Sequence, residues 1–387
     1  MYFNKIDKTI FNTVKFQENK NDNINCIVYA NNYISAKNYL INKLKCNVKE
    51  YPFIKAFGIN ASINNIKILA QKSHVKYISS NAKVFAQMNK TREVMKICDV
   101  QKQFKGNGVT VAVIDTGINE SLDFCSFKNR ILCFKDFVNK KTEPYDDNGH
   151  GTFVAGVLCG NGFLSGKKFC GVAPNCNIIM CKALDSNGET GALTILEAMQ
   201  WIYDHKEEYN IKVVCMSFGS QPLQNGDPLM LGAESLWNDG IVVVAAAGNS
   251  GPDQCTIKSP GVSGKIITVG ALDDCRDTEN IDINKFKVAD FSSRGPAFKF
   301  YKPDCIACGV DIISCCNNND EFYTNMSGTS VATPIVAGCC ALLLEKYPNL
   351  SPMSVKNKIL KSCHKLTNDR NADGFGYLDA SMLCDLN

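Results

Sequence analysis

Residues 109–115 read VTVAVID, a short apolar run that ends directly in a carboxylate. The run is continuous and does not alternate with polar residues, which is typical of a strand covered on both faces of a parallel sheet. Similar runs recur at 177–184, 213–218, 241–247 and 265–271, with helical patterns between and after them. This alternation predicts an α/β fold with a mostly parallel, doubly wound sheet. In such a sheet ligands bind at the carboxyl ends of the strands, so the polar residues there are the first candidates for a site.

The composition is that of a globular protein. Of 387 residues, 45% are hydrophobic and 21% are charged. The N-terminus shows no apolar segment followed by a small-residue cleavage site, and no stretch approaches the 18 or more consecutive apolar residues of a membrane span. We therefore expect a cytoplasmic protein without a membrane partner.

The twenty cysteines are scattered through apolar segments of a long chain. In a reducing compartment such cysteines behave as small hydrophobic residues, which is the interpretation we favour. The alternative is a zinc site at Cys305 and Cys308, which are spaced C-x-x-C and followed by Cys315 and Cys316.

Residues 1–90 carry 14 Lys and Arg against 4 Asp and Glu, whereas the remainder of the chain is acidic. A basic segment can bind nucleic acid, but here the charges are dispersed along predicted strands and helices. Docking onto the acidic remainder of the same chain explains this asymmetry better, and we expect no nucleic-acid partner.

The basic segment has a strand and helix pattern of its own. Strands are predicted within 25–30, 51–61 and 75–80, and helices at 34–44 and 63–71. This order predicts a small α+β unit of the split-βαβ, ferredoxin-like kind. The polar residues 81–105 that follow are predicted to be a linker.

Three residues at predicted strand or helix ends suggest a common chemistry. Alone, Asp115 could be a turn residue, His150 a helix-start residue and Ser330 an N-cap. Together they supply a nucleophile, the imidazole that takes its proton, and the carboxylate that orients the imidazole. Their order in the chain is Asp, His, Ser, and Ser330 lacks the G-x-S-x-G motif of α/β-hydrolases.

Three segments resemble the signatures of the subtilisin-like serine peptidases, in the order of that family. They are VAVIDTGI at 111–118, NGHGTFVAG at 148–156 and MSGTSVATPIVAG at 326–338. Further similar segments are GVAP at 171–174, MSFG at 216–219, AAAGNSGP at 245–252 and DFSSRGP at 290–296. The pattern is most similar to the bacterial branch with intracellular-type members.

The resemblance implies two domains and a set of site residues. Residues 1–90 would be a prodomain that assists folding and inhibits until it is cleaved, and 91–387 the peptidase domain. Asp115 would orient His150, His150 would act as general base and then acid, and Ser330 would form the acyl-enzyme. Asn249 would supply the oxyanion hole, and Ser217, Phe218 and Gly219 would pair with the substrate backbone.

The chain departs from the family pattern at three places. Phe153 stands where a second histidine is usual, Cys308 where proline is usual, and Val331 where methionine is common. None of the three takes part in proton transfer, so the resemblance still implies an active enzyme.

Lys258 aligns with the base of the pocket for the substrate side chain before the scissile bond. A lysine there would favour a Glu or Asp side chain through a charge-assisted contact. The alternative is a flexible lysine that extends into solvent.

No cofactor is required for this chemistry. The residues do not decide whether the protein binds a structural calcium ion. Asp369, Asn371, Asp373 and Gly374 follow a D-x-N-x-D-G pattern, but Ala380 stands where the closing glutamate of a calcium loop belongs. A polar surface turn is the alternative. Residues 160–170 do not preserve a clear calcium site of the family.

We therefore predict a serine endopeptidase that acts on polypeptides, is inhibited by its own prodomain in cis, and cleaves itself between about residues 80 and 95. The alternatives are a catalytically silent subtilase that serves as a scaffold, and an esterase that uses the same triad.

Overall fold

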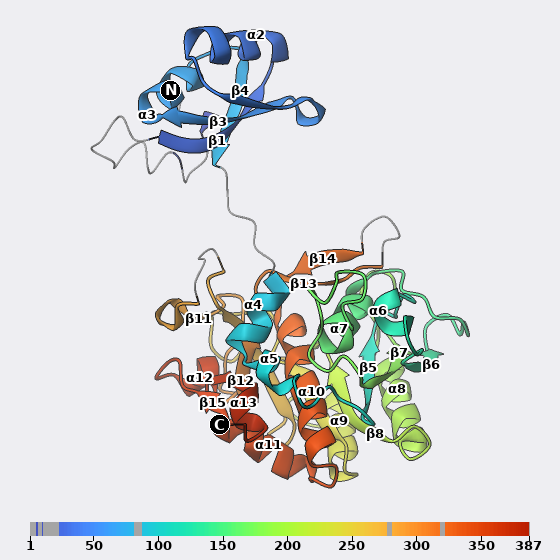
Figure 1. Cartoon of the computed structure of the whole chain (residues 1–387). Helices are drawn as coiled ribbons and strands as arrows, with labels where there is room; N and C mark the ends of the chain where they lie inside the picture. Colours follow the sequence, from blue (N-terminus) through green and yellow to red (C-terminus); the bar gives the residue numbers. More distant parts are fainter. Residues whose placement is uncertain are drawn as a thin grey trace. The chain divides into compact units, whose positions relative to one another are not determined.

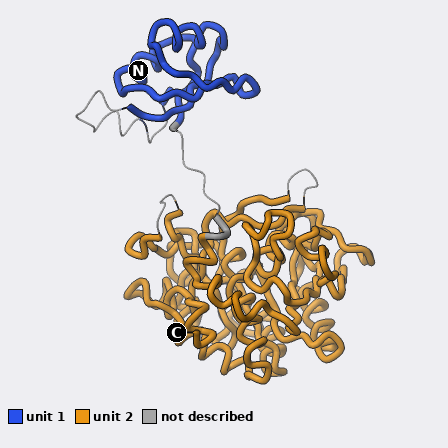
Figure 2. Tube along the Cα trace, in the orientation of Figure 1, with its two compact units in different colours: residues 1–84 blue, residues 85–387 orange. Residues whose placement is uncertain are grey.

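A computed structural model describes residues 5–6, 10, 23–80, 87–276, 281–317 and 322–386. The chain divides into two compact units, residues 1–84 and 85–387 (Figure 2).

Unit 1, residues 1–84, contains an antiparallel sheet with the order β2-β3-β1-β4 and two helical segments. The sequence of elements, βαββαβ, is the predicted split-βαβ arrangement. Cys26, Val28 and Ala30 alternate with more exposed residues along β1, and they join buried residues of both helical segments in one core. The elements are β1 (Asn23–Ala30), α2 (Tyr33–Asn38) continued by a π-helical turn (Tyr39–Lys43), β2 (Val48–Tyr51), a 3₁₀ turn (Pro52–Ile54), β3 (Ala56–Ser62), α3 (Ile63–Ala70) and β4 (Val75–Ser80).

Most of the predicted linker is structured. Within 81–105 the chain forms α4 (Gln87–Val94) and α5 (Ile97–Val100), which belong to unit 2. Met95, Ile97 and Val100 are fully buried there. The linker prediction was wrong because most residues of this segment are polar, so no clear helical pattern is visible. The packing of a few apolar side chains against the core nevertheless stabilises the helices.

Unit 2, residues 85–387, is built on a ten-stranded sheet (Figure 1). Its central part runs β12-β10-β9-β8-β5-β7-β6, with every neighbouring pair parallel. Every residue of β5 is buried, which requires cover on both faces of the sheet and confirms the predicted α/β fold. The strands are β5 (Thr110–Asp115), β6 (Ile131–Asp136), β7 (Asn177–Lys182), β8 (Ile211–Met216), β9 (Val242–Ala246), β10 (Ile267–Asp273) and β12 (Cys305–Cys308).

Two pairs of helices cover this sheet. Helix α7 (His150–Cys159) packs against α10 (Thr329–Lys346), and α8 (Ala192–His205) packs against α9 (Pro228–Asn238). Helix α10 is long and apolar enough to cross a membrane, yet 83% of it is buried inside the protein, where it contacts β8, β9 and β10. It is therefore the central helix of the core.

The remaining elements lie at the edges of unit 2. Strand β16 continues the sheet parallel to β12, and β11 and β15 add antiparallel edges. These elements are α6 (Leu122–Cys125), a 3₁₀ turn (Ile283–Lys285), β11 (Lys287–Val288), the hairpin of β13 (Ile312–Cys315) and β14 (Tyr323–Met326), α11 (Pro352–Lys361), β15 (Cys363–His364), α12 (Arg370–Asp373), β16 (Tyr377–Leu378) and α13 (Ala380–Leu383).

The strand order reverses beside β5. On one side of β5 the neighbouring strands are β7 and then β6. On the other side they are β8 and then β9. In a doubly wound sheet this switch point opens a crevice at the carboxyl ends of the strands. The switch point in this sheet lies between β5 and β8, whose carboxyl ends are followed by the site candidates Asp115, the last residue of β5, and Ser217.

Candidate active site

The predicted site residues gather at one edge of the sheet. Asp115 is the last residue of β5, Ser217–Gly219 follow β8, and Asn249 lies three residues after β9. Because β5, β8 and β9 are parallel neighbours, their carboxyl ends lie side by side. His150 and Ser330 come from the first turns of α7 and α10.

Asp115 and His150 form a hydrogen-bonded pair. His150 Nδ1 lies 2.8 Å from Asp115 Oδ1, and the exposed fractions of the two side chains are 25% and 1%. The backbone N–H of Thr116 also donates to Asp115 Oδ1 at 2.8 Å. A buried carboxylate on Nδ1 fixes the imidazole tautomer in which Nε2 is free to accept a proton.

The surroundings of His150 favour its protonated form. Burial lowers the pKa of the imidazole, but the charge of Asp115, the hydrogen bond to it and the charge of Asp146 outweigh that effect. The pKa of His150 therefore lies above its ordinary value of 6.5. The ring is a stronger base than a free histidine, while its outer edge remains accessible.

Two glycines allow the chain to close around this pair. Gly117 has a φ of +130°, and a Cβ there would collide with the backbone of Tyr145. A Cβ on Gly151 would collide with the carbonyl oxygen of Gly117 and lie 3.2 Å from the Asp115 Cβ. The glycine after His150 thus permits the start of α7 to approach the end of β5.

Asp146 holds the turn before His150, a role that the sequence reasoning missed. Its carboxylate accepts from the backbone N–H groups of Gly149 and Thr152, both at 2.8 Å, and from the Thr152 hydroxyl at 2.6 Å. The Thr116 hydroxyl donates to it at 2.9 Å, so one side chain links the turn after Asp115 to the start of α7. The only available signal was an Asp a few residues before a glycine-flanked helix start; the N-cap itself is Gly149.

Lys182, the last residue of β7, also stabilises the turn after Asp115 and was not identified from the sequence. Its ammonium group is fully buried and donates to the carbonyl oxygens of Thr116 at 2.6 Å and Leu184 at 3.0 Å, and to Asp147 at 2.6 Å. A buried lysine is stable only when its charge is compensated in this way. Nothing in the apolar run 177–184 marks this partner.

Asn249 is oriented by the residue before Ser330. Its side-chain oxygen accepts from the backbone N–H of Thr329 at 2.9 Å and from the Thr329 hydroxyl at 3.0 Å. The amide nitrogen therefore points the other way, and both Asn249 Nδ2 and Ser330 Oγ border Gly328. A Cβ on Gly328 would lie 3.0 Å from Ser330 Oγ and 3.3 Å from Asn249 Nδ2.

Ser330 lies in the first turn of α10 and is half-buried. Among the described residues no acceptor is recorded for its backbone N–H, as is usual for the first N–H groups of a helix. This N–H and the Asn249 amide are two donors beside one hydroxyl, and the N-terminus of α10 adds its positive dipole.

The structure thus brings the predicted residues together in two contacting pairs, Asp115 with His150 and Asn249 with the Thr329–Ser330 turn. Between His150 and Ser330 no hydrogen bond is recorded in the described part of the chain. A contact of this kind often tightens only when substrate is bound.

The segment after β8 presents open main-chain groups. In the described part of the chain, none of the recorded loop hydrogen bonds uses the N–H or C=O groups of Ser217, Phe218 or Gly219. Beyond them, Ser220 pairs with Ser259 in both directions at 2.9 Å. An extended peptide can therefore add to this segment as a further strand.

Lys258 lies beside this segment. A Cβ on Gly219 would lie 2.6 Å from the Lys258 Cβ, and one on Gly248 would collide with its Cγ. The stem of Lys258 therefore runs between the segments that follow β8 and β9, and the residue is half-buried.

The residues that depart from the family pattern are all in the core. Phe153, Cys308 and Val331 are buried, and Cys308 Sγ donates to Asp274 at 3.6 Å. Nothing in the structure explains why this chain has Phe153 in place of the usual histidine.

The structure describes the residues of both possible metal motifs. Cys305 and Cys308 are buried in β12. Asp369 caps α12 by accepting from Asn371 N–H at 2.9 Å, and Asp373 accepts from Thr367 N–H at 2.6 Å, so both carboxylates serve the local backbone. Within the described residues, no group of three or more His, Cys, Asp or Glu side chains is placed to hold a metal ion.

Comparison with known proteins agrees with the geometry. The model of the subtilase family matches residues 106–377. Serine protease AprX of Bacillus subtilis is 42% identical over 300 residues, which cover 72% of this chain and 66% of that protein. Subtilisin DY of Bacillus licheniformis is 35% identical over 254 residues, covering 65% and 82%.

Solved structures give the same result. The S41 psychrophilic protease matches with a TM-score of 0.62 and 31% identity, covering 71% of this chain and 92% of its own. The paired Asp115 and His150, the Asn249 amide beside Ser330 and the family match to residues 106–377 lead to one conclusion. The chain belongs to the subtilase family, the subtilisin-like serine peptidases.

Proposed function

We propose that this chain is an active endopeptidase that hydrolyses peptide bonds through Asp115, His150 and Ser330, and that it is made as a self-processing zymogen. The observation that carries the proposal is the 2.8 Å contact between His150 Nδ1 and the buried Asp115 carboxylate. A catalytically silent scaffold has no need of a buried carboxylate that orients an accessible imidazole.

Each residue has a defined step in the reaction. Ser330 Oγ attacks the carbonyl carbon of the scissile bond, and His150 Nε2 takes the hydroxyl proton while Asp115 stabilises the imidazolium. The developing oxyanion accepts hydrogen bonds from Asn249 Nδ2 and the Ser330 N–H.

The second half of the reaction releases the two products. His150 gives its proton to the leaving amine, which departs and leaves an acyl-enzyme on Ser330. A water then loses its proton to His150 and attacks the ester, which frees the new carboxyl end and restores the serine.

The test compares peptide and ester hydrolysis by wild type and two variants. Ser330→Ala is expected to lose both activities, whereas Ser327→Ala, an exposed serine three residues earlier, is expected to keep them. Thermal unfolding of all three proteins controls for folding. Ester hydrolysis without amide hydrolysis by wild type would show an esterase, and equal activity of Ser330→Ala would refute the triad.

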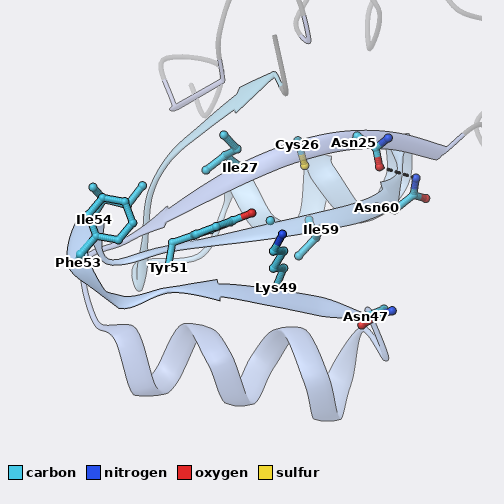
Figure 3. Close-up of a pocket in the computed structure, with 11 residues that line it drawn as sticks. Asn25, Cys26, Ile27, Asn47, Lys49, Tyr51, Phe53, Ile54, Ile59 and Asn60 are labelled. Carbon is cyan, nitrogen blue, oxygen red and sulfur yellow. Dashed lines mark hydrogen bonds between the residues drawn. The ribbon is translucent and has the colours of Figure 1, made fainter. Parts of the chain in front are cut away.

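Unit 1 is proposed to act as the prodomain. Its two helical segments bury one face of the sheet, and the other face carries a shallow hollow of about 450 Å³ (Figure 3). Its lining includes Ile27, Tyr51, Gly58 and Lys49. Asn60, which also lines it, donates to Asn25 at 2.8 Å from β3 to β1. An open, partly apolar sheet face on a basic unit supports docking onto an acidic protein surface.

The predicted processing window can be narrowed. Within this window, residues Gln87–Val94 form α4 and Met95 is fully buried. A protease needs an extended substrate, so we propose cleavage before Gln87.

Mass spectrometry of purified wild type and Ser330→Ala tests this step. Wild type is expected to yield a fragment that begins at or before residue 87, and Ser330→Ala only the intact chain. A fragment produced equally by both proteins would exclude self-processing.

A further inference from the structure

Lys258, which aligns with the base of the family's pocket for the side chain before the scissile bond, is held in place by its backbone. Lys258 N–H donates to Ala247 O at 2.8 Å, and the next residue, Ser259, pairs with Ser220 in both directions. The Ser259 hydroxyl donates to the buried carboxylate of Asp227 at 2.7 Å. Residues 258–259 therefore tie the segment after β9 to the segment after β8.

The side chain of Lys258 enters the gap between these two segments. Neither Gly219 nor Gly248 has room for a Cβ, because the Lys258 stem occupies that space. Gly248 also has a φ of +105°, which side-chain-bearing residues rarely adopt. The two glycines thus leave space for the stem of Lys258. A lysine side chain that extended into solvent would not require glycine at either position.

The charge of Lys258 is not compensated within the described residues. No hydrogen bond or ion pair of its ammonium group is recorded there. The nearby carboxylate of Asp227 is already occupied by Ser259 and by the backbone N–H groups of Leu223 and Met230. A lysine ammonium group with no recorded counterion in the described part of the chain can pair with an anion that arrives with a ligand.

The substrate's position follows from the proposed function, on which this inference rests. In that function, the carbonyl oxygen of the scissile bond meets Asn249 Nδ2 and the substrate backbone pairs with residues 217–219. In the subtilase family, a peptide bound in this way places the side chain that precedes the scissile bond beside the segments that follow β8 and β9. In this chain such a side chain would approach Lys258, whose stem lies between Gly219 and Gly248.

We propose that Lys258 makes this enzyme selective for glutamate or aspartate immediately before the scissile bond. The substrate carboxylate would accept a charge-assisted hydrogen bond from the ammonium group of Lys258. Such a bond corresponds to a preference of about tenfold or more over an uncharged side chain of the same shape.

The selectivity has a consequence for processing. Residues 51–92 contain no Asp or Glu, so the region before Gln87 is a poor substrate for such an enzyme. Cleavage there is then favoured within one chain, where the junction is held at a high effective concentration.

The test uses four peptide anilides that differ only in the residue before the scissile bond, which is Glu, Gln, Phe or Lys. For wild type at low salt, kcat/KM for Glu is expected to exceed that for Gln by about tenfold, and the excess is expected to shrink as salt is added. In Lys258→Met, which keeps the apolar stem, the Glu to Gln ratio is expected to fall to about one while Phe hydrolysis persists. Lys128→Met, an exposed lysine on the turn after α6, is the matched control and is expected to keep the wild-type ratio.

The outcomes separate this inference from the proposed function. If wild type cleaves the Gln and Phe peptides, and Lys258→Met leaves the Glu to Gln ratio unchanged, the selectivity is refuted and the peptidase stands. If folded wild type cleaves none of the four peptides, and none of the larger polypeptides tested beside them, the proposed function itself fails. Mapping the cleavage sites in an unfolded protein substrate gives a second readout, in which wild type is expected to cleave mainly after Glu and Asp.

Discussion

The ends of β5 and β9 are built in different ways. At β5, the turn after Asp115 is enclosed: Lys182 donates to the Thr116 carbonyl oxygen, and Asp146 links the Thr116 hydroxyl to the start of α7. Beside the end of β9, the main-chain groups of residues 217–219 and the ammonium group of Lys258 have no recorded partner among the described residues. The difference separates two tasks, because proton transfer needs fixed geometry, whereas substrate recognition needs groups that are still free to bind.

The largest expected effect comes from the enclosed end. Asp115→Asn keeps the shape of the side chain but allows the wrong imidazole tautomer, and kcat is expected to fall about 10⁴-fold, as known for this change in serine proteases. Steady-state hydrolysis of a peptide anilide checks this. A loss below tenfold would show that Asp115 does not orient His150.

Asn249→Ala is expected to have the next largest effect. It removes one of two oxyanion donors, and kcat is expected to fall about 10²- to 10³-fold, the loss established for the equivalent residue of subtilisin itself. KM is expected to change little, because the donor acts mainly on the transition state. Asn238→Ala, at the end of α9, is the control. A change confined to KM would place Asn249 in substrate binding only.

Asp146→Asn tests how far the enclosed end depends on one carboxylate. In the variant, an amide NH₂ group would replace one oxygen that now accepts a hydrogen bond from the backbone N–H of Gly149 or Thr152. Because two donors would then face each other, the free energy of unfolding is expected to fall by about 2 kcal/mol. Chemical denaturation measures this, with Glu120→Gln, an exposed carboxylate nearby, as the control. Equal stability of the two variants would show that the Asp146 contacts are dispensable.

The smallest expected effect is on the pH profile. Because the base must be neutral, kcat/KM is expected to fall as the pH drops below the pKa of His150, with a midpoint above 6.5. Removing the charge of Asp146 disfavours the imidazolium, so Asp146→Asn is expected to move this midpoint to lower pH. A midpoint that stays in place, or rises, would contradict the electrostatic coupling between Asp146 and His150.

The sequence predicted the fold because the central strands are continuous apolar runs. Strand β5 was predicted from the apolar run at 109–115 and lies at Thr110–Asp115, and Ser330, a possible N-cap by sequence, lies in the first turn of α10 (Thr329–Lys346). Asp115, His150 and Ser330 could be found because each directly ends or begins such an element. The residues linked to a strong local pattern were therefore predictable.

The supporting contacts were not predictable in this way. Lys182 lies within an apolar strand, and no sequence pattern marks Thr329 as a partner, although its N–H and hydroxyl orient Asn249. Such partners are set by tertiary packing between segments far apart in the chain. The helices at 87–100 were missed for a similar reason, because a few buried side chains outweigh a polar composition.

The central claim is that Ser330 is the nucleophile activated by His150, and active-site labelling tests it most directly. A serine-reactive phosphonate is added to folded wild type and to His150→Ala, and the modified peptide is mapped by mass spectrometry. We predict stoichiometric modification of Ser330 in wild type and a much slower reaction in His150→Ala. Modification of another residue, or no modification of folded wild-type protein with unit 1 removed, would contradict the claim.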